Sequence, residues 1–316
     1  MVLAGAALIA LALIPGLFSV APKFSDLTTH FKPEMTASSL AQLRSDFSGL
    51  SAAQTQFSDQ VVPAFATALG VPPAELSETL DQKFPATSTG LQALPTMSAQ
   101  FNQTLTALTN EVPNFEQADS IPTASISPAA IPWVLVVVGA LLIACGVLVR
   151  RWWQVGVALV IGALLVATPL ALSLPGKATA ADSMNSQMGP LFTAKAVAGA
   201  DQSLSTLETM STQMQTEMVP ALAQMLNMPS TQFNSYLAAN FPALGSALSD
   251  LPTTVAQFKS LVTAFDESLT DYNDIHSTQF APIVTTILAT GGFVLLVGLL
   301  GAAELALRRR SGVMAS

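Results

Sequence analysis

The stretch FPATSTGLQALPTMSAQF at residues 84–101 returns in similar form as FPALGSALSDLPTTVAQF at residues 241–258. The two stretches begin 157 positions apart (241 − 84 = 157). Aligned without a gap at this offset, residues 62–107 and 219–264 are identical at 19 of 46 positions. We call two residues equivalent when their numbers differ by 157. The sequence therefore contains an internal repeat, whose copies we call the first and second halves.

Apolar residues around both stretches recur in alternating steps of three and four, which places an apolar seam along one side of a long helix. In the second half the seam is Leu248, Leu251, Val255, Phe258, Val262, Phe265, Leu269 and Tyr272; in the first it is Leu91, Leu94, Ser98, Phe101, Leu105, Leu108, Val112 and Phe115. Upstream, the first-half series Leu43, Phe47, Leu50, Gln54, Phe57 and Val61 is matched by Ala200, Leu204, Leu207, Ser211, Met214 and Met218. Each half is expected to form a long outgoing helix, a short crossing helix and a long returning helix.

Prolines mark the expected helix boundaries. Pro72 and Pro229 suit the first turn of the short crossing helix, where a missing backbone N–H costs nothing. Pro95 and Pro252 suit either the start of the returning helix or a kink within it. The segment Glu116–Ala130, rich in proline and serine, is expected to be a stiff, irregular tether.

The composition predicts an all-α integral membrane protein. Of 316 residues, 51% are apolar and only 10% are charged, against roughly 25% charged in ordinary soluble domains. Four apolar runs, each long enough for a helix to cross a hydrocarbon core of ~30 Å, predict transmembrane helices at residues 2–21, 131–149, 155–174 and 281–307. The first run lacks a basic flank and is followed by Pro22, so we expect it to be retained rather than cleaved as a signal peptide.

Charge placement predicts the topology. Arg150 and Arg151 lie in the short turn at residues 150–154, and Arg308–Arg310 begin the tail at residues 308–316. The long segment 22–130 holds four basic and ten acidic residues, and 175–280 holds three and nine, so each has a net charge of −6. Because arginines flanking spans stay in the cytoplasm, both termini are expected to be cytoplasmic and both long segments extracytoplasmic, in the plasma (inner) membrane.

The repeat unit is a span, a long segment and a second span. Because a unit with two spans returns the chain to its starting side, both halves enter the membrane in the same direction. This predicts a parallel tandem repeat with a pseudo-twofold axis along the membrane normal and two homologous extracytoplasmic helical-bundle domains, 22–130 and 175–280. The layout resembles that of prominins and tweety-type proteins, which carry an extra span; the resemblance covers the order of elements and no shared motif.

Two groups of polar residues are candidates for chemistry. Glu304 is the only acid within a predicted span and is a functional candidate, but Arg308 follows at i+4 and offers an ion pair. Asp271, Asp274 and His276 could form a weak divalent-cation site, but a solvated acidic helix end is the favoured interpretation. Nucleophile-elbow, P-loop and dinucleotide-binding motifs are absent from the sequence. We predict no catalytic, cofactor-binding or metal-binding residues and no enzymatic activity. A cluster of acidic residues around a metal ion in the outer segments would favour an enzyme again.

Met210, Met214 and Met218 follow one helix face and allow three interpretations: apolar core, a surface for lipid or another apolar ligand, or a Cu(I) site. Their equivalents are Ala53, Phe57 and Val61, which cannot bind copper, so the core is favoured. Cys145, the single cysteine, is expected to be a packing residue of a span. Small residues four apart predict close helix approach in the membrane: Ala158/Gly162, Ala140/Ala144 and Gly298/Ala302.

These observations predict a non-enzymatic accessory or scaffold subunit of the cell envelope, whose paired outer helical domains bind a protein partner. The alternative is a component that binds or transports a lipid or another apolar ligand, in a groove between the kinked spans and the outer helices. Expected partners are membrane lipids and either a protein or a second copy of the chain, through the outer domains and the small-residue faces of the spans. Nucleic acid is excluded because the outer segments are acidic.

Overall fold

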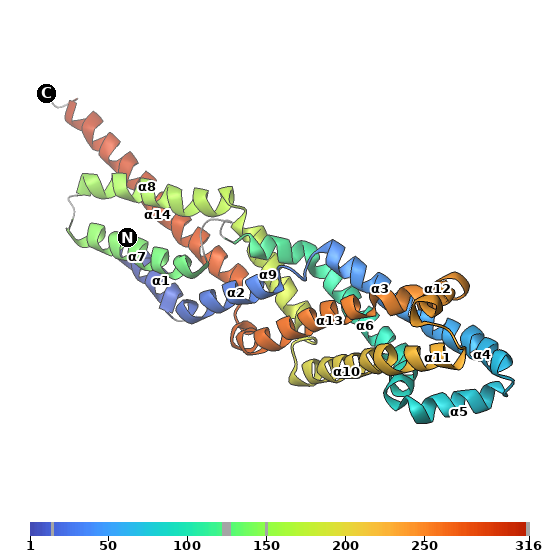
Figure 1. The fold of residues 1–316 in the computed structure, drawn as a ribbon. Helices are drawn as coiled ribbons and strands as arrows, with labels where there is room; N and C mark the ends of the chain where they lie inside the picture. Colours follow the sequence, from blue (N-terminus) through green and yellow to red (C-terminus); the bar gives the residue numbers. More distant parts are fainter. Residues whose placement is uncertain (14–15, 122–127, 149–150, 314–316) are drawn as a thin grey trace. The chain divides into compact units, whose positions relative to one another are not determined.

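The computed structural model describes residues 1–13, 16–121, 128–148 and 151–313, and within these ranges it contains no strand. The prediction of an all-helical chain is confirmed (Figure 1). The α-helices are α1 (Val2–Leu13), α2 (Leu17–Phe31), α3 (Ala37–Gln56), α4 (Val62–Leu69), α5 (Pro73–Lys83), α6 (Pro85–Asp119), α7 (Ile131–Leu148), α8 (Arg151–Ala171), α9 (Leu174–Met188), α10 (Ala194–Gln213), α11 (Val219–Met225), α12 (Ser230–Asn240), α13 (Pro242–Ile275) and α14 (Phe280–Val313). Short π-helices cover Phe57–Val61 and Met214–Met218, and a 3₁₀ turn covers Pro128–Ala130.

The chain forms two compact units, and each unit takes residues from both halves. The bundle unit comprises residues 33–112 and 190–269, and the span unit comprises residues 1–32, 113–189 and 270–316. This differs from the predicted arrangement, in which 22–130 and 175–280 form one helical bundle each. The reason is that the apolar seams of the two halves pack against each other within the bundle unit instead of each closing on itself.

Three phenylalanines show this packing. The rings of Phe101 on α6 and Phe258 on α13, which are equivalent positions, lie with centroids 4.9 Å apart. Phe47 on α3 contacts both, at 4.1 Å from Phe101 and 5.6 Å from Phe258. All three side chains are buried. Offset and edge-on aromatic pairs of this kind add about 0.5–1.5 kcal/mol to the burial of the rings, so the centre of the bundle joins the two halves.

The predicted order of helices within each half is confirmed. In each half a long helix is followed by a short crossing helix that starts directly after Pro72 or Pro229, and then by a long returning helix. Pro95 and Pro252 lie inside α6 and α13 rather than at their starts. Helix α6 continues to Asp119, so the tether predicted at Glu116–Ala130 is shorter than expected, and its residues 122–127 lie outside the described part.

The backbone breaks at equivalent positions in the two halves. Among the described residues, positive φ angles occur at Gly16 (66°) and its equivalent Ser173 (54°), and at Gly70 (70°) and its equivalent Asn227 (56°). The second pair ends α4 and α11 in the same way: the N–H one residue later reaches back to a carbonyl of the helix, at 3.0 Å and 2.9 Å. The second half holds left-handed conformations without glycine, at a cost of about 1–2 kcal/mol for an ordinary residue.

Both π-helices precede a proline. Pro63 and Pro220 stand directly after the first residue of α4 and α11. A proline ring collides with the carbonyl four residues earlier in a regular α-helix. The extra residue per turn removes this collision: the N–H of Val62 donates to the carbonyl of Phe57, five residues earlier. The sequence periodicity predicts a continuous α-helix here, and the proline explains the difference.

Three helices of the span unit are long and apolar enough to cross a membrane: Pro128–Val147, Trp153–Ala171 and Phe280–Leu307. The run predicted as the first span, residues 2–21, is instead divided between α1 and α2, which differ in direction by 51°. A fourth span exists only if this bent pair counts as one. The break falls at residues 14 and 15, which lie outside the described part and include Pro15. Gly16, the residue directly before α2, has a left-handed backbone conformation. This conformation contributes to the change of direction between α1 and α2.

Helices of the span unit pack in two pairs, α1 with α7 and α8 with α14 (Figure 1). Glycines make both contacts close: a Cβ atom on Gly5 would lie 2.4 Å from the carbonyl oxygen of Gly139, and one on Gly162 would lie 2.6 Å from the backbone nitrogen of Leu295. The predicted contribution of Gly162 is therefore confirmed. Ala140 and Ala144 are instead exposed on α7.

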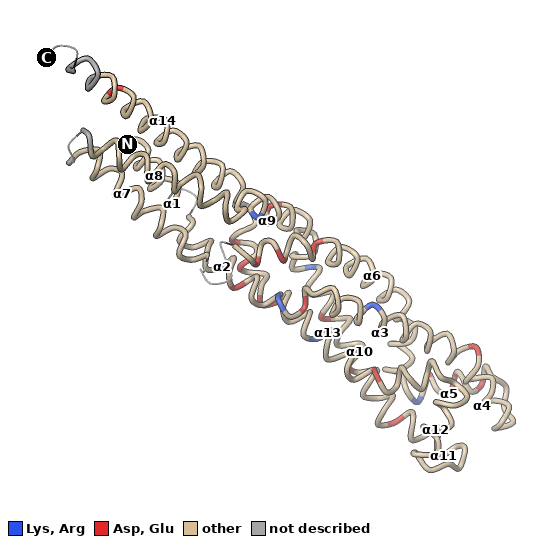
Figure 2. Tube along the Cα trace, turned by 90° about the horizontal axis from the view of Figure 1, so that it is seen from above, with Lys and Arg blue, Asp and Glu red and all other residues tan. Residues whose placement is uncertain are grey.

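Two of the paired helices, α1 and α7, contain no charged residue, whereas α14 contains Glu304. Figure 2 shows no charge along α1 and α7, and none in the described part of α8 beyond its first turn. The exposed residues of these helices are large and apolar, for example Leu3 (81% exposed) and Val147 (68% exposed). Such surfaces suit a lipid environment. Of the arginines that predict the topology, Arg150 lies outside the described residues, as do the side chains of Arg151 and Arg308–Arg310.

Candidate functional site

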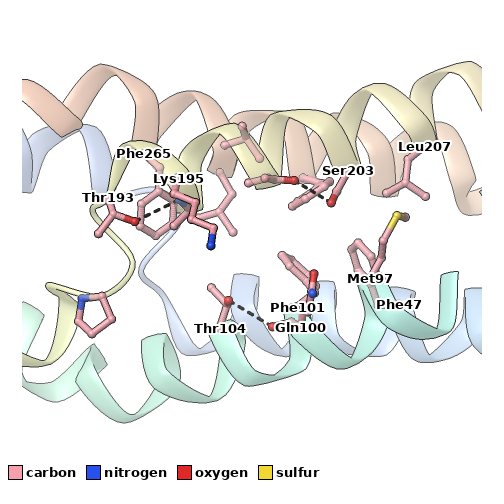
Figure 3. A pocket seen from close by; sticks show the side chains of 17 residues that line it. Phe47, Met97, Gln100, Phe101, Thr104, Thr193, Lys195, Ser203, Leu207 and Phe265 are labelled. Atoms are coloured by element: carbon pink, nitrogen blue, oxygen red, sulfur yellow. Dashed lines mark hydrogen bonds between the residues drawn. The ribbon is translucent and has the colours of Figure 1, made fainter. Parts of the chain in front are cut away.

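A groove of about 480 Å³ runs along one side of the bundle unit (Figure 3). Its volume lies within the range of roughly 300–1,000 Å³ typical of ligand sites. Residues of four helices and of the segment before α10 line the groove. They are Met97, Gln100, Phe101 and Thr104 of α6; Pro190, Thr193, Lys195, Ala196, Gly199, Ala200, Ser203 and Leu207 of α10 and the residues before it; Phe258, Leu261, Val262 and Phe265 of α13; and Phe47 of α3.

The floor of the groove is aromatic and aliphatic. Phe47, Phe101 and Phe258 form the three-ring cluster described above, and Leu207 beside them is fully buried. Phe265 packs on Phe192, with ring centroids 5.0 Å apart. These side chains are the seam residues that the helical periodicity predicts to be buried. The groove therefore reaches down to the bundle core, whose side chains remain buried at its floor.

The end of the groove near the start of α10 holds the polar Thr193 and the charged Lys195 beside Phe265 (Figure 3). Thr193 is the N-cap of α10, where its hydroxyl oxygen accepts a hydrogen bond of 3.1 Å from the N–H of Ala196. Thr104 and Ser203 donate their hydroxyl hydrogens to carbonyl groups of their own helices, at 3.3 Å and 2.9 Å. These hydroxyl groups are already bonded within the protein and add little positive or negative charge to the site.

Lys195 is the one charged residue among the described residues that line the groove. Its side chain is exposed, and Figure 3 shows the ammonium group pointing into the space between α10 and α6. Within the described part of the chain, this group has no hydrogen-bond or ion-pair partner. It lies in the first turn of α10, where the helix dipole adds positive potential. One end of an apolar groove is therefore cationic, in a chain with a net charge of −8.

The groove exists because α10 carries small residues where α3 carries large ones. Gly199 and Ala200 are equivalent to Gln42 and Leu43. Leu43 is 1% exposed and fills the core on the α3 side, whereas the shorter Ala200 lines the groove. A leucine exceeds an alanine by three carbon atoms, so this exchange alone opens considerable space.

The charges differ as well. Ser38 is equivalent to Lys195, and Asp46 is equivalent to Ser203. Asp46 accepts a hydrogen bond of 3.4 Å from the hydroxyl group of Thr254, which is buried, so this acid faces α13. At the positions that line the groove, the α10 side is thus open and carries Lys195, whereas the equivalent α3 positions are filled by Leu43 and carry Asp46. The two sides of one bundle have acquired different properties.

The methionines of α10 and the following π-helix belong to the core, as the favoured interpretation predicts. Met210, Met214 and Met218 are each at most 4% exposed. A Cβ atom on Gly90 would lie 2.5 Å from the sulfur of Met210, so glycine leaves the room that this side chain occupies. The equivalent positions hold Ala247 and Ala53, which line the same small cavity of about 20 Å³. The large Met210 and the very small Gly90 thus correspond to two alanines, Ala53 and Ala247, at the equivalent positions.

Asp274 and His276, near the end of α13, both contact other groups of the protein. Asp274 forms an ion pair with Lys23 of α2, and the imidazole Nδ1 of His276 lies 2.6 Å from the carbonyl oxygen of Asn273. Across the described ranges, no three His, Cys, Asp or Glu residues are grouped so that they could hold a metal ion. The structure gives the weak cation site considered at Asp271, Asp274 and His276 no further support.

Tyr272 lies beside these acids. Its hydroxyl group donates a hydrogen bond of 2.6 Å to the carbonyl oxygen of Asn185, and its ring stacks on the imidazole of His276. Burial raises the pKa of Tyr272 above its usual 10.0. On the same side, both carboxylate oxygens of Asp182 accept backbone N–H groups of Phe280 and Ala281, at 2.7 Å and 2.9 Å, and cap α14. These contacts hold the ends of α9, α13 and α14 together.

Glu304 lines a cavity of about 600 Å³ in the span unit, with Gln154, Gly298 and Gly301 among its neighbours. Gln154 donates hydrogen bonds of 3.2 Å and 3.3 Å to the carbonyls of Cys145 and Gly146. The side chain of Arg308, the predicted partner of Glu304, lies outside the described part. Cys145 is half-buried, as expected for a packing residue.

The sequence interpretation did not identify the groove, although a signal was present. Position 200 belongs to the predicted seam of the second half, and it holds alanine where the first half has Leu43. A small residue in a seam, next to an unmatched lysine at position 195, marks the place where the two halves differ most in volume and charge.

Searches of family models, curated proteins and solved structures find nothing that matches this chain. Its function must therefore be inferred from its own residues.

Proposed function

We propose that this chain is a membrane protein that binds a lipid-like apolar ligand in the groove between α6, α10 and α13. The observation that carries the proposal is a groove of about 480 Å³ within the bundle unit, whose lining is mostly apolar and reaches down to the buried ring cluster. Apolar lining that faces water in such a groove costs about 25 cal/mol per Å² of exposed area. A ligand with an apolar chain removes this cost when it covers the apolar lining.

The membrane arrangement that we propose has the helices of the span unit anchored in the plasma membrane. Three helices support this directly, and the bent pair α1–α2 would supply a fourth span. With both termini cytoplasmic, the bundle unit is extracytoplasmic. Equivalent helix bounds, π-helices and left-handed residues support a parallel tandem repeat with a pseudo-twofold axis along the membrane normal. The ligand would then be met outside the cytoplasm.

Ligand retention tests the function. The full chain, purified from native membranes in a mild detergent, is extracted and analysed by mass spectrometry beside Ala200→Leu. This variant restores the residue of the equivalent position, Leu43, and should fill the groove. We expect the wild type to retain an apolar molecule that Ala200→Leu retains at a much lower level. Equal retention by both chains, or none by either, would contradict the proposal. Gly199→Gln, which introduces the residue equivalent to Gln42, is a second filling variant should Ala200→Leu misfold.

Labelling of single cysteines tests the topology. Cys145→Ser removes the native thiol, and a cysteine is then placed at Glu78, at Ser235 or in the tail 308–316. Glu78 and Ser235 are both exposed. A membrane-impermeant maleimide should label the first two in intact cells and the tail only after permeabilisation. Labelling of Glu78→Cys and Ser235→Cys on different sides would contradict the arrangement.

The second candidate is an accessory or scaffold subunit that binds a protein partner. One observation favours it: α5 exposes three acids at positions whose equivalents on α12 are uncharged, namely Glu75, Glu78 and Asp81 against Gln232, Ser235 and Ala238. Crosslinking in native membranes tests this candidate. A protein that crosslinks to the wild type should be lost when the three acids become amides and kept in Ala200→Leu. A partner lost from neither variant would argue against docking on α5.

A further inference from the structure

We infer that the groove takes a single-chain amphiphile with an anionic head group, held with its charge at Lys195 and its chain on the phenylalanine floor. This inference rests on the proposed function and specifies the ligand. Three features of the groove carry it: its volume, the separation of its polar and apolar ends, and the difference between the two halves.

The volume selects one chain. A water-sized group occupies ~30 Å³, and a methylene group is of similar size. The groove of about 480 Å³ therefore holds on the order of 16 such groups. One long acyl chain fills it, whereas the two chains of a common phospholipid do not fit together.

The groove has a direction. It follows α10 from Thr193 to Leu207, which is 14 residues or about 21 Å at ~1.5 Å per residue. Figure 3 shows Thr193 and Lys195 at one end and Leu207, Met97 and Phe47 at the other. A ligand with one polar end fits this arrangement in a single orientation, with its head group at the start of α10.

The charge selects an anion. Lys195 has no partner among the described residues, and no acid lines the groove there. The first turn of α10 adds its dipole in the same direction. A carboxylate or a phosphate placed beside Lys195 forms a charge-assisted hydrogen bond, whereas a neutral head group does not.

The comparison of the halves argues that these features belong together. On the α3 side the lysine is replaced by Ser38, the alanine by Leu43 and Ser203 by Asp46. Space and positive charge are both present on the α10 side, and both are missing from the equivalent positions. A gap left by loose packing alone would not require the change in charge.

Photoactivatable lipids test the inference on the full chain in detergent or nanodiscs. The probes are a diazirine-bearing palmitate, its neutral methyl ester and the matching lysophosphatidate, with diacyl phosphatidate as the two-chain comparison. Crosslinked peptides are mapped by mass spectrometry. We expect palmitate, lysophosphatidate or both to label the groove segments of α6, α10 and α13, and the diacyl lipid to label them weakly. The ratio of the first two distinguishes a free carboxylate from a lysolipid phosphate as the natural head group.

Three variants separate the outcomes. Lys195→Ser, which copies the equivalent Ser38, should weaken binding of the anionic probes roughly fivefold, the effect of losing one exposed ion pair, and leave the methyl ester unchanged. Lys83→Ser, at an exposed lysine of α5 outside the groove, is the matched control and should change neither. Ala200→Leu should abolish labelling by all single-chain probes.

The outcomes distinguish the two proposals. If Ala200→Leu abolishes labelling but Lys195→Ser affects ester and acid alike, the groove binds apolar chains without regard to charge and the inference fails while the proposed function stands. If the groove segments are not labelled, or labelling persists in both Ala200→Leu and Gly199→Gln, both proposals fail. Strong labelling by the diacyl lipid would overturn the single-chain assignment.

Discussion

The side-chain oxygen of Gln213 accepts a hydrogen bond of 2.9 Å from the backbone N–H of Thr87, 126 residues away in the sequence. The equivalent bond joins Gln56 to the N–H of Leu244, also at 2.9 Å. Thr87 and Leu244 are the third residues of α6 and α13, whose first-turn N–H groups have no partner within the helix. Each half of the chain thus caps the long returning helix of the other.

Replacing one glutamine should loosen the helix that it caps. Gln56→Leu removes the acceptor for Leu244 and should lower the free energy of unfolding by about 1 kcal/mol. Hydrogen exchange at the start of α13 should accelerate. Gln56→Glu is the control, because it keeps an oxygen acceptor and its charge suits a helix N-terminus. Unchanged exchange in Gln56→Leu would argue against the cap.

The packing of Gly90 against Met210 predicts strong coupling between these positions. Gly90→Ala brings a methyl group against the methionine sulfur and should destabilise the bundle by about 1–3 kcal/mol, partly offset by the higher helix propensity of alanine. Met210→Ala leaves a void that should cost about 2–5 kcal/mol.

The double variant Gly90→Ala/Met210→Ala reproduces the alanine pair of the other half, Ala247 and Ala53. It should be more stable than the sum of the two single effects predicts, by about 0.5–3 kcal/mol. Denaturant unfolding of the detergent-solubilised chain measures all four states of the cycle. Additive effects would show that the two positions do not share one space.

Two glycines of α8 should respond differently to the same change. A Cβ atom on Gly162 would lie 2.6 Å from the backbone of Leu295, whereas one on Gly156 would meet nothing within 4 Å. Gly162→Ala should therefore separate α8 from α14 and lower the thermal stability in detergent, because close backbone approach drives helix association in lipid. Gly156→Ala should leave it unchanged or raise it. A similar decrease in both variants would contradict the contact.

The chain has two tyrosines, so the ionisation of Tyr272 can be isolated. In Tyr236→Phe, titration followed by tyrosinate absorbance should give a midpoint above the usual 10.0, since burial disfavours the phenolate. The unfolded chain releases this proton near pH 10 while the folded chain keeps it. The contribution of Tyr272 to stability is therefore full below pH ~10 and is lost as the pH rises from there through the folded pKa.

Tyr272→Phe should remove this part of the loss of stability at high pH, and Tyr236→Phe should not. A Tyr272 midpoint at or below that of a free tyrosine would show that the side chain is solvated in the folded chain.

Local signals in the sequence predict the helices well. The seam around Phe101 and Phe258 and the prolines at positions 72 and 229 identify most elements of the bundle unit, because helix periodicity and N-terminal proline act within a few residues. The π-helices were not predicted, although Pro63 and Pro220 are their cause. A proline inside a periodic pattern indicates a disturbance and does not specify its form.

The way in which the two halves pack against each other could not be predicted from the sequence. Phe84 and Phe241 precede α6 and α13 and have no side-chain oxygen, so the starts of these helices look uncapped until the glutamine of the other half is in place. These caps form only because the two halves pair in one bundle. The periodicity of each seam is equally compatible with two separate bundles. The groove depends on the same pairing, since Ala200 opens space only against α6 and α13.

The interlocked halves also affect how such a chain can change. A chain with one half would leave the Thr87 amide without its acceptor and Phe101 without Phe258, and would need a second molecule to complete its core. In that homodimer every substitution would appear twice, so an opening at one interface would be copied at the other. Joining two copies in one polypeptide fixes the stoichiometry and removes this symmetry. One face can remain filled by Leu43 and preserve stability while the other, at Ala200, becomes a binding surface.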